Sequence, residues 1–236
     1  MITVRPSEAR GRADFGWLDS KHSFSFGEYY DPAHMGFRDL RVINEDKVAP
    51  KGGFPNHSHR DMEIISYVLE GELAHQDSMG NGSIIKPGDA QRMSAGTGVR
   101  HSEFNPNPKE PVHFLQIWIQ PAERNIEPGY EEKHFSPQEK RGRLRLIVSP
   151  DRADGSLLIH QDAKLYAGLF TGNERTEFRT ARGRRIYLHV ARGALTANDT
   201  PLEAGDALRI TDGAALGLSD ARDAEVLVFD LPGEAG

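Results

Sequence analysis

The sequence predicts an all-β protein built from two similar domains. Three observations support this prediction: short segments alternate polar and apolar residues, turn residues separate them at short intervals, and one stretch of the chain is repeated. Alternation places successive side chains on opposite faces of a strand, the pattern of a half-buried sheet. The 236 residues include 24 glycines and 14 prolines, enough for frequent turns. A sandwich or barrel of short strands is therefore expected.

Strands are expected where the alternation is clearest. These segments are, in chain order, 22–26, 40–42, 144–148 and 224–229. Glu70 and Gly71 lie between the apolar runs ISYVL and ELAHQ and predict a hairpin, whereas Asn81 and Gly82 predict a type I′ turn. Apart from short turns near 136–141, long stretches with apolar residues at helical spacing are missing, so little helix is expected.

An internal repeat predicts two tandem domains. Residues 67–90 read YVLEGELAHQDSMGNGSIIKPGDA, and residues 187–207 read YLHVARGALTANDTPLEAGDA. Gly71 matches Gly193, and both copies end in Gly-Asp-Ala. Self-similarity of this kind is typical of a duplicated structural unit.

The segment between the two copies is polar and contains prolines, which is typical of a linker. We therefore expect an N-terminal domain over 1–125, a linker over 126–142 and a C-terminal domain over 143–236.

Composition argues against several classes of function. The formal net charge of −6 provides no basic surface, so direct binding to nucleic acid is not expected. The chain has no cysteine, which excludes disulfides, thiolate metal sites and a cysteine nucleophile. Its most apolar run, Val112–Ile119, is too short to cross a bilayer, and the first residues lack the apolar segment of a secretory signal. A cytoplasmic protein without membrane association is expected.

One region concentrates histidines and carboxylates at ligand spacing. His57 and His59 are two residues apart, and His101 and Glu103 repeat this spacing farther along the chain. Residues i and i+2 of a strand point to the same face, so each pair can converge on one point. Three imidazoles and one carboxylate suit Fe(II), Mn, Co, Ni, Cu or Zn and leave positions for oxygen or substrate. The alternative is that these are surface or strand-end histidines.

A second carboxylate, Glu63, also has ligand spacing. It follows His59 by four residues, and on an unbroken strand it would face the same side as that histidine. Spacing alone therefore leaves both Glu63 and Glu103 as candidate carboxylate ligands.

The spacings His57-x-His59-x3-Glu63 and Gly98-x2-His101-x3-Asn105 resemble the two motifs of the cupin superfamily, although Gly96 stands where cupins usually carry proline. Further stretches are similar to the pirin family, in particular to bacterial pirin-like proteins described as quercetin 2,3-dioxygenases. These stretches are Gly16–Phe26, Tyr30–Pro32, Met35–Phe37, Arg41–Asn44, His75–Gly80 and Met93–Gly98. The resemblance is dense over 10–121 and thin thereafter.

The resemblance implies a bicupin, with two jelly-roll-like β-barrel domains facing each other and one divalent metal ion in the N-terminal domain. The family's ligands map onto His57, His59, His101 and Glu103. The implied metal is Fe(II), although Zn, Mn, Co, Ni or Cu can occupy such a site. Glu63 would then orient a ligand imidazole.

The repeat supplies a separate expectation for the C-terminal domain. The alignment of the two copies matches the three histidines and two glutamates to residues of the second copy. The matched residues are Arg179, Ala181, Arg185, Leu218 and Asp220. Since none of these is a histidine, the C-terminal domain is not expected to bind a metal.

The activity implied by the resemblance is a dioxygenase that opens flavonols such as quercetin with O₂ and releases carbon monoxide. Glu103 would be the catalytic group that accepts the proton of the substrate's 3-hydroxyl. One alternative is a metal- and redox-dependent regulator that acts through protein partners, as eukaryotic pirins are described. Another is a binding protein for a small acid or phenol. A cavity at the metal wide enough for a bicyclic ligand would favour the enzyme.

The remaining histidines and aromatic residues are expected to be mainly structural. His22 and His75 lie in family-like stretches but are expected to be packed strand residues, and His113 a satisfied interior or interface residue. The aromatic residues Trp17, Phe24, Phe26 and Phe54 are expected in the core, although a flat polyphenol would suit any that line the barrel mouth.

Overall fold

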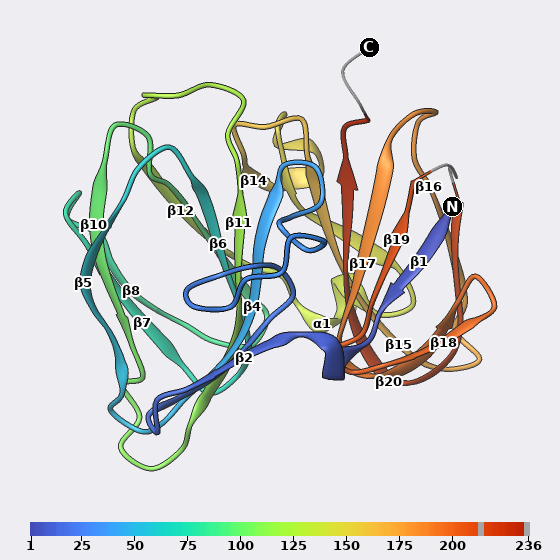
Figure 1. Cartoon of the computed structure of the whole chain (residues 1–236), viewed down its shortest axis with the longest axis horizontal. Coiled ribbons are helices and arrows are strands. Elements are labelled where there is room, and N and C mark those ends of the chain that lie inside the picture. The colour runs from blue at the N-terminus through green and yellow to red at the C-terminus, as the bar shows by residue number, and fades with distance from the viewer. Residues whose placement is uncertain (212–214, 234–236) are drawn as a thin grey trace. The chain divides into compact units, whose positions relative to one another are not determined.

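The protein is described by a computed structural model, which covers residues 1–211 and 215–233. These residues are nearly all in strands and turns, which confirms the all-β prediction (Figure 1). The chain divides into two units. The N-terminal unit comprises Gly11–His134 and Leu157–Gln161, and the C-terminal unit comprises Met1–Arg10, Phe135–Ser156 and the chain from Asp162 onward.

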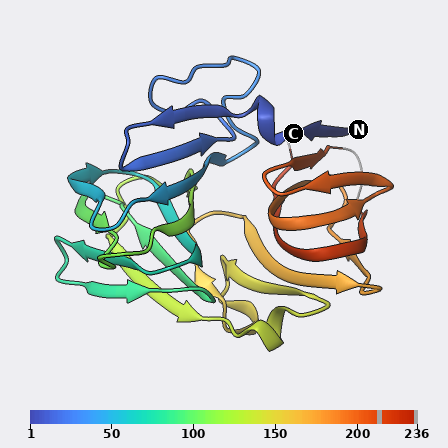
Figure 2. The same cartoon turned by 90° about the horizontal axis from the view of Figure 1, so that it is seen from below.

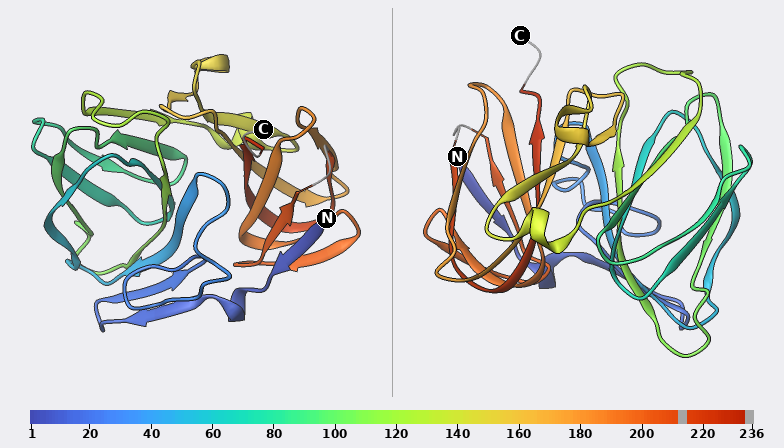
Figure 3. Two further views of the ribbon diagram at one scale, coloured as in Figure 1. Left: turned by 45° about the horizontal axis from the view of Figure 1, so that its top comes forward. Right: turned by 180° about the vertical axis from the view of Figure 1, so that it is seen from behind.

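Two antiparallel sheets form the N-terminal unit, and the two further views of Figure 3 show their strands in blue, cyan and green. The first sheet has the order β12-β9-β6-β11-β4-β3-β2 and the second has the order β5-β10-β7-β8. The first consists of β2 (Gly11–Asp14), β3 (Leu18–His22), β4 (Leu40–Val48), β6 (Glu63–Glu70), β9 (Asp89–Ser94), β11 (Val112–Ile119) and β12 (Gly129–His134). The second consists of β5 (Gly53–His59), β7 (Leu73–Asp77), β8 (Gly82–Ile85) and β10 (Val99–Phe104). The short β14 (Leu157–Leu158) also belongs to this unit.

Apolar side chains from both sheets form the core of the N-terminal unit. One buried cluster consists of Leu18, Val48, Val68, Leu73, Ile85, Val112 and Phe114. Val112 and Phe114 lie two positions apart on β11, as expected where one face of a sheet is buried. The contacts between the sheets therefore fix which side chains point inward.

A row of polar residues crosses the inward face of the seven-stranded sheet. The strand register places these residues directly opposite one another on successive strands. The row consists of His22 (β3), Asn44 (β4), Gln116 (β11), Ser66 (β6) and Gln91 (β9). All five are buried. Because buried polar groups are costly without hydrogen-bond partners, such a row indicates a function beyond packing.

The C-terminal unit is built mainly on one antiparallel sheet, whose orange and red strands are clearest in Figure 2. Its strands run in the order β1-β19-β17-β20-β15-β13, with β16 also paired to β20 and β18 to β17. They are β1 (Ile2–Arg5), β13 (Leu144–Ser149), β15 (Lys164–Gly172), β16 (Thr176–Arg179), β17 (Arg185–Ala197), β18 (Thr200–Glu203), β19 (Ala207–Ile210) and β20 (Ala215–Leu231). Three short helices, η1 (Ser7–Ala9), α1 (Pro137–Lys140) and η2 (Ala153–Gly155), complete the unit. Alternate residues of β17, Ile186, Leu188 and Val190, are fully buried in its core.

The sequence repeat corresponds to similar backbone structure in the two units. Gly71 and Gly193 both have positive φ, at 74° and 66°. A Cβ on Gly193 would lie 2.3 Å from the carbonyl oxygens of Arg222 and Asp223, so a side chain is excluded there by contact as well as by conformation. The matched Leu73 and Leu195 are both buried.

The expected domain boundaries differ from this division in two places. Residues 2–5 form β1, which pairs with β19 of the C-terminal unit rather than joining the N-terminal one. The expected linker over 126–142 contains β12, which pairs with β9, followed by α1. The polarity of this segment reflects a strand with one exposed face, which from sequence resembles a linker.

Two predicted turns are also wrong. The strands on either side of Gly71, β6 and β7, do not pair with each other but belong to different sheets. The positive φ of the β7–β8 turn belongs to Gly80, not to Asn81 and Gly82. Oδ1 of Asp77 shapes this turn by accepting hydrogen bonds from the backbone N–H groups of Met79 and Asn81. An Asp that binds the following backbone is an alternative to an Asn-Gly turn.

Candidate metal centre

Three histidines converge where β5 and β10 pair. His57 and His101 lie directly opposite each other in the antiparallel register, and their Nε2 atoms are 3.0 Å apart. The ring centroid of His59 lies 4.7 Å from that of His57 and 4.8 Å from that of His101. One nitrogen from each ring lies within 4.8 Å of the others, close enough for all three to reach one ion.

The backbone fixes the orientation of His57. Its Nδ1 donates a hydrogen bond to the carbonyl oxygen of Pro55 at 2.8 Å. Because a carbonyl can only accept, Nδ1 carries a proton, which leaves Nε2 as the nitrogen that faces His101.

Glu103 lies beside this cluster, one inward position beyond His101. The pairing of β10 with β5 has a bulge between these two residues, which alters how the strand presents its side chains. The Glu103 carboxylate is buried and accepts hydrogen bonds from Oγ of Ser66 at 3.0 Å and Nε2 of Gln116 at 2.6 Å. Burial raises the pKa of Glu103 to about 7. The carboxyl can therefore gain or lose a proton near neutral pH.

Glu63, the alternative carboxylate, points away from the three histidines. The strand of His59 ends at that residue, and Glu63 begins β6 in the other sheet. Its Oε2 accepts a hydrogen bond from Oγ of Ser94 at 2.9 Å, and its Oε1 lies 3.4 Å from Nδ1 of His160. The argument from an unbroken strand therefore fails for Glu63, and so does its expected contact with a ligand imidazole.

His75 lies against the far side of His101. Its Nε2 donates to Oδ2 of Asp77 at 3.2 Å, and its Nδ1 accepts from Nε2 of Gln91 at 3.1 Å. Nδ1 of His101 lies 3.5 Å from the same Nδ1 of His75. This arrangement can orient the His101 ring and leave its Nε2 facing His57. His75, His101 and Glu103 also form a second cluster with ligand atoms close together.

The environment keeps the imidazoles neutral. Burial, with the neighbouring His57, lowers the pKa of His59 to about 4. Burial, with the neighbouring histidines, lowers the pKa of His101 to about 3. Near pH 7 both rings are therefore uncharged, which is the form that coordinates metals.

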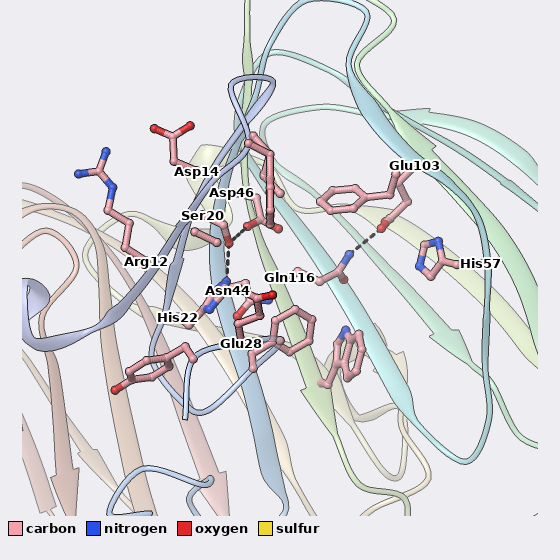
Figure 4. Close-up of a pocket in the computed structure, with 18 of the residues that line it drawn as sticks. Arg12, Asp14, Ser20, His22, Glu28, Asn44, Asp46, His57, Glu103 and Gln116 are labelled. Carbon is pink, nitrogen blue, oxygen red and sulfur yellow. Dashed lines mark hydrogen bonds between the residues drawn. The ribbon is translucent and has the colours of Figure 1, made fainter. Parts of the chain in front are cut away.

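A cavity of about 650 Å³ opens beside the histidines (Figure 4). It is wide enough for a bicyclic ligand, the feature that favours an enzyme over a regulator. His57, His59 and Glu103 line it together with the aromatic residues Phe26, Phe54 and Trp118.

Several other residues have positions that the sequence left open. His22 is a buried residue of β3, as expected, and it also lines the cavity. Phe24 is buried, and Trp17 packs edge-on against Phe54, with ring centroids 5.3 Å apart. His113 is satisfied, because its Nε2 lies 2.9 Å from Oε1 of Glu45.

In the C-terminal unit, two of the residues that the repeat matches to the N-terminal ligands have structural roles. Leu218 is buried in the core of the C-terminal unit, and Arg179 forms an ion pair with Glu177. Among the described residues, both clusters that could hold a metal lie in the N-terminal unit.

Sequence reasoning missed the polar residues around Glu103, namely Ser66 and Gln116, and those on the opposite wall, Asn44 and Asp46. Their signal was a polar residue at an inward position of an apolar strand, such as Gln116 within VHFLQIWI.

Comparison with known proteins agrees with this geometry. The Pirin family model matches residues 3–119, and the model of the quercetinase C-terminal cupin domain matches residues 146–231. The chain is 47% identical over 232 residues to quercetin 2,3-dioxygenase of Escherichia coli K12, covering 98% of this chain and 99% of that protein. The chain belongs to the pirin family. The predicted family and the bicupin fold are therefore confirmed.

Other pirins extend the comparison. A crystal structure of the bacterial pirin YhhW from Escherichia coli, in complex with nickel(II), is 46% identical, with a TM-score of 0.94. The match covers 99% of this chain and 100% of that one. A pirin-like protein of Caulobacter vibrioides is 40% identical over 98% of this chain and 99% of its own length.

Proposed function

We propose that this pirin is a metal-dependent dioxygenase that opens flavonols such as quercetin with O₂ and releases carbon monoxide. The observation that carries the proposal is the convergence of three histidines beside a large cavity whose wall includes a buried carboxylate, Glu103. A relative named quercetin 2,3-dioxygenase, 47% identical over nearly the full length, supports the choice of substrate.

The proposed metal ligands are His57, His59, His101 and Glu103. The donor set fits a divalent transition metal, because imidazole nitrogens with one carboxylate form a borderline site. The 3.0 Å between the Nε2 atoms of His57 and His101 is the separation expected of two nitrogens that share one ion at about 2.1 Å. We propose Fe(II) as the ion, held singly in each chain. The nickel(II) complex of the Escherichia coli pirin indicates that other ions are also accepted.

When bound, the ion would supply a Lewis acid and the chemistry of O₂ activation at the cavity wall. The other roles belong to the chain's own residues. Glu103 accepts the proton of the substrate's 3-hydroxyl, while Ser66 and Gln116 hold its carboxylate in place. Phe26, Phe54 and Trp118 form an apolar wall that suits a flat ring system and limits water.

The test is reconstitution of the full chain with Fe(II) under anaerobic conditions, followed by addition of quercetin in air. Quercetin consumption, the ring-opened product and carbon monoxide are measured, with the bound metal quantified in the same samples. We expect turnover in the wild type and none in His57→Ala. His134→Ala is the matched control, because His134 is exposed and pairs only with Asp89 among the residues described. Bound metal without turnover of several flavonols would contradict the proposal.

The alternative of a redox-dependent regulator acting through protein partners has no support in the relatives reported above, and we do not propose it.

A further inference from the structure

The cavity has a second polar wall that the proposed metal site does not use. We propose that Ser20, His22, Asn44 and Asp46 bind the peripheral hydroxyl groups of a polyhydroxylated aromatic substrate and so select it over less hydroxylated analogues. This inference rests on the proposed function, because it assumes that the 3-hydroxyl end of the substrate lies at the metal ligands.

The position of this wall follows from the strand register. Asn44 lies directly opposite Gln116 on one side and His22 on the other, so the polar row continues from the Glu103 partner across β4 to β3. With a strand spacing of about 4.8 Å, His22 lies about 10 Å along the row from Gln116. Figure 4 shows Ser20, His22, Asn44 and Asp46 grouped on the cavity side away from His57.

The polar row combines donors that bind other side chains with two amide oxygens, Oε1 of Gln91 and Oδ1 of Asn44, that accept no hydrogen bond from the described residues. In the half nearer the histidines, Ser66 and Gln116 donate to Glu103, and Gln91 donates to His75. In the other half, Asn44 is 4% exposed, yet none of the described residues donates a hydrogen bond to its Oδ1. Asn44 lines the cavity, and a buried amide oxygen without a donor is costly unless a ligand hydroxyl or a water supplies one.

The neighbours of Asn44 form a connected group that can both donate and accept. Oγ of Ser20 donates to Oδ1 of Asp46, and Nε2 of His22 lies 2.9 Å from the same Oγ. Burial raises the pKa of Asp46 to about 7, so this carboxyl can also exist in its neutral form near neutral pH. Mixed donors and acceptors of this kind suit phenolic hydroxyls, which also do both.

A continuous aromatic surface joins the second polar wall to the histidines. The ring centroid of Phe26 lies 5.2 Å from that of His22 and 5.3 Å from that of Trp118, both edge-on. The Trp118 centroid in turn lies 5.0 Å from that of His59. A flat ligand lying along these rings would therefore reach both polar ends of the cavity.

The charge of the cavity favours neutral hydroxyl groups over acidic substituents. Asp46 is buried in its wall, and a ligand carboxylate or sulfate would be repelled by its ionised form. The chemical class that fits is a flat polyphenol with hydroxyl groups on the rings remote from its chelating group.

The test compares two probes on the full chain loaded with Zn(II), which cannot cycle its oxidation state, so that binding is measured without turnover. Quercetin carries hydroxyl groups on its outer rings, whereas 3-hydroxyflavone keeps the chelating 3-hydroxyl and 4-carbonyl but lacks the others. We expect the wild type to bind quercetin about tenfold more tightly, because one well-made hydrogen bond is worth up to about that factor.

Asn44→Leu should remove most of that preference while leaving the affinity for 3-hydroxyflavone unchanged, which also controls for folding and metal loading. Ser20→Ala provides a second, less disruptive variant, which should also lower the preference for quercetin over 3-hydroxyflavone. Equal affinities of the wild type for both probes, or an undiminished preference in both variants, would overturn this inference alone. Failure of both compounds to bind would overturn the proposed function, and this inference with it.

Discussion

Nε2 of His57 and Nε2 of His101 face each other at 3.0 Å from directly opposed residues of β5 and β10. Pro55 holds one ring through Nδ1, and His75 lies against Nδ1 of the other. Both rings are therefore oriented from behind, which is the usual arrangement of imidazoles that ligate metals. This relationship explains how two motifs distant in sequence can form one centre.

Replacing His101 with alanine should remove most of the bound metal. The variant loses a nitrogen ligand and opens a gap beside His57 and His59. Metal content after purification and reconstitution is the measurement, with His134→Ala as the control. Metal content equal to that of the wild type would show that His101 is not a ligand.

The two glutamates should respond differently to amide substitution. Glu103→Gln should lower metal content strongly, because it removes the charged oxygen ligand of the proposed site. Glu63→Gln should retain most of the metal, since Glu63 contacts Ser94 and His160 instead. The metal content of the two variants is measured in parallel. Equal loss of metal in both would reverse the assignment of Glu103 as the carboxylate ligand.

His75 should act on the metal through His101. His75→Leu removes the group against Nδ1 of His101, and we expect about a 10- to 100-fold loss of metal affinity. His75→Gln, which retains an oxygen acceptor, should lose less. Competition with a chelator measures both affinities, and an unchanged value for His75→Leu would argue against this positioning role.

Asp46 should make the metal-free protein less stable as pH rises. Its pKa is about 7 when folded against 3.8 ordinarily, so between these values the folded protein binds the proton that the unfolded chain releases. The free energy of unfolding therefore falls with rising pH over that window. From pH 5 to pH 8, the free energy of unfolding of Asp46→Asn should therefore rise by about 3 kcal/mol relative to that of the wild type. Urea unfolding at the two pH values tests this, and parallel changes in both proteins would refute it.

Much of the N-terminal unit could be predicted from the sequence. Alternation identified strands such as that around Leu40, and i, i+2 spacing paired His57 with His59 and His101 with Glu103. These are local properties of a strand, so they do not require knowledge of how strands are arranged.

The remainder depended on the pairing of distant strands. Glu63 has the spacing of a ligand, but the chain turns after His59 and the next strand joins another sheet. Likewise, Asn44 and Gln116 are neighbours only because β4 and β11 pair in that register. Register is set by the whole core and by turn geometry, which a pattern along one strand does not contain.

The central claim is that the histidine cluster holds the metal at which a flavonol is opened. Its most direct test is carbon monoxide release from quercetin as Fe(II) is titrated into metal-free protein, with bound metal measured at each step. The proposal predicts that release rises in proportion to bound metal, stops rising at a single ion per chain, and is absent in His101→Ala. A chain that binds its full complement of Fe(II) and releases no carbon monoxide from quercetin would contradict it.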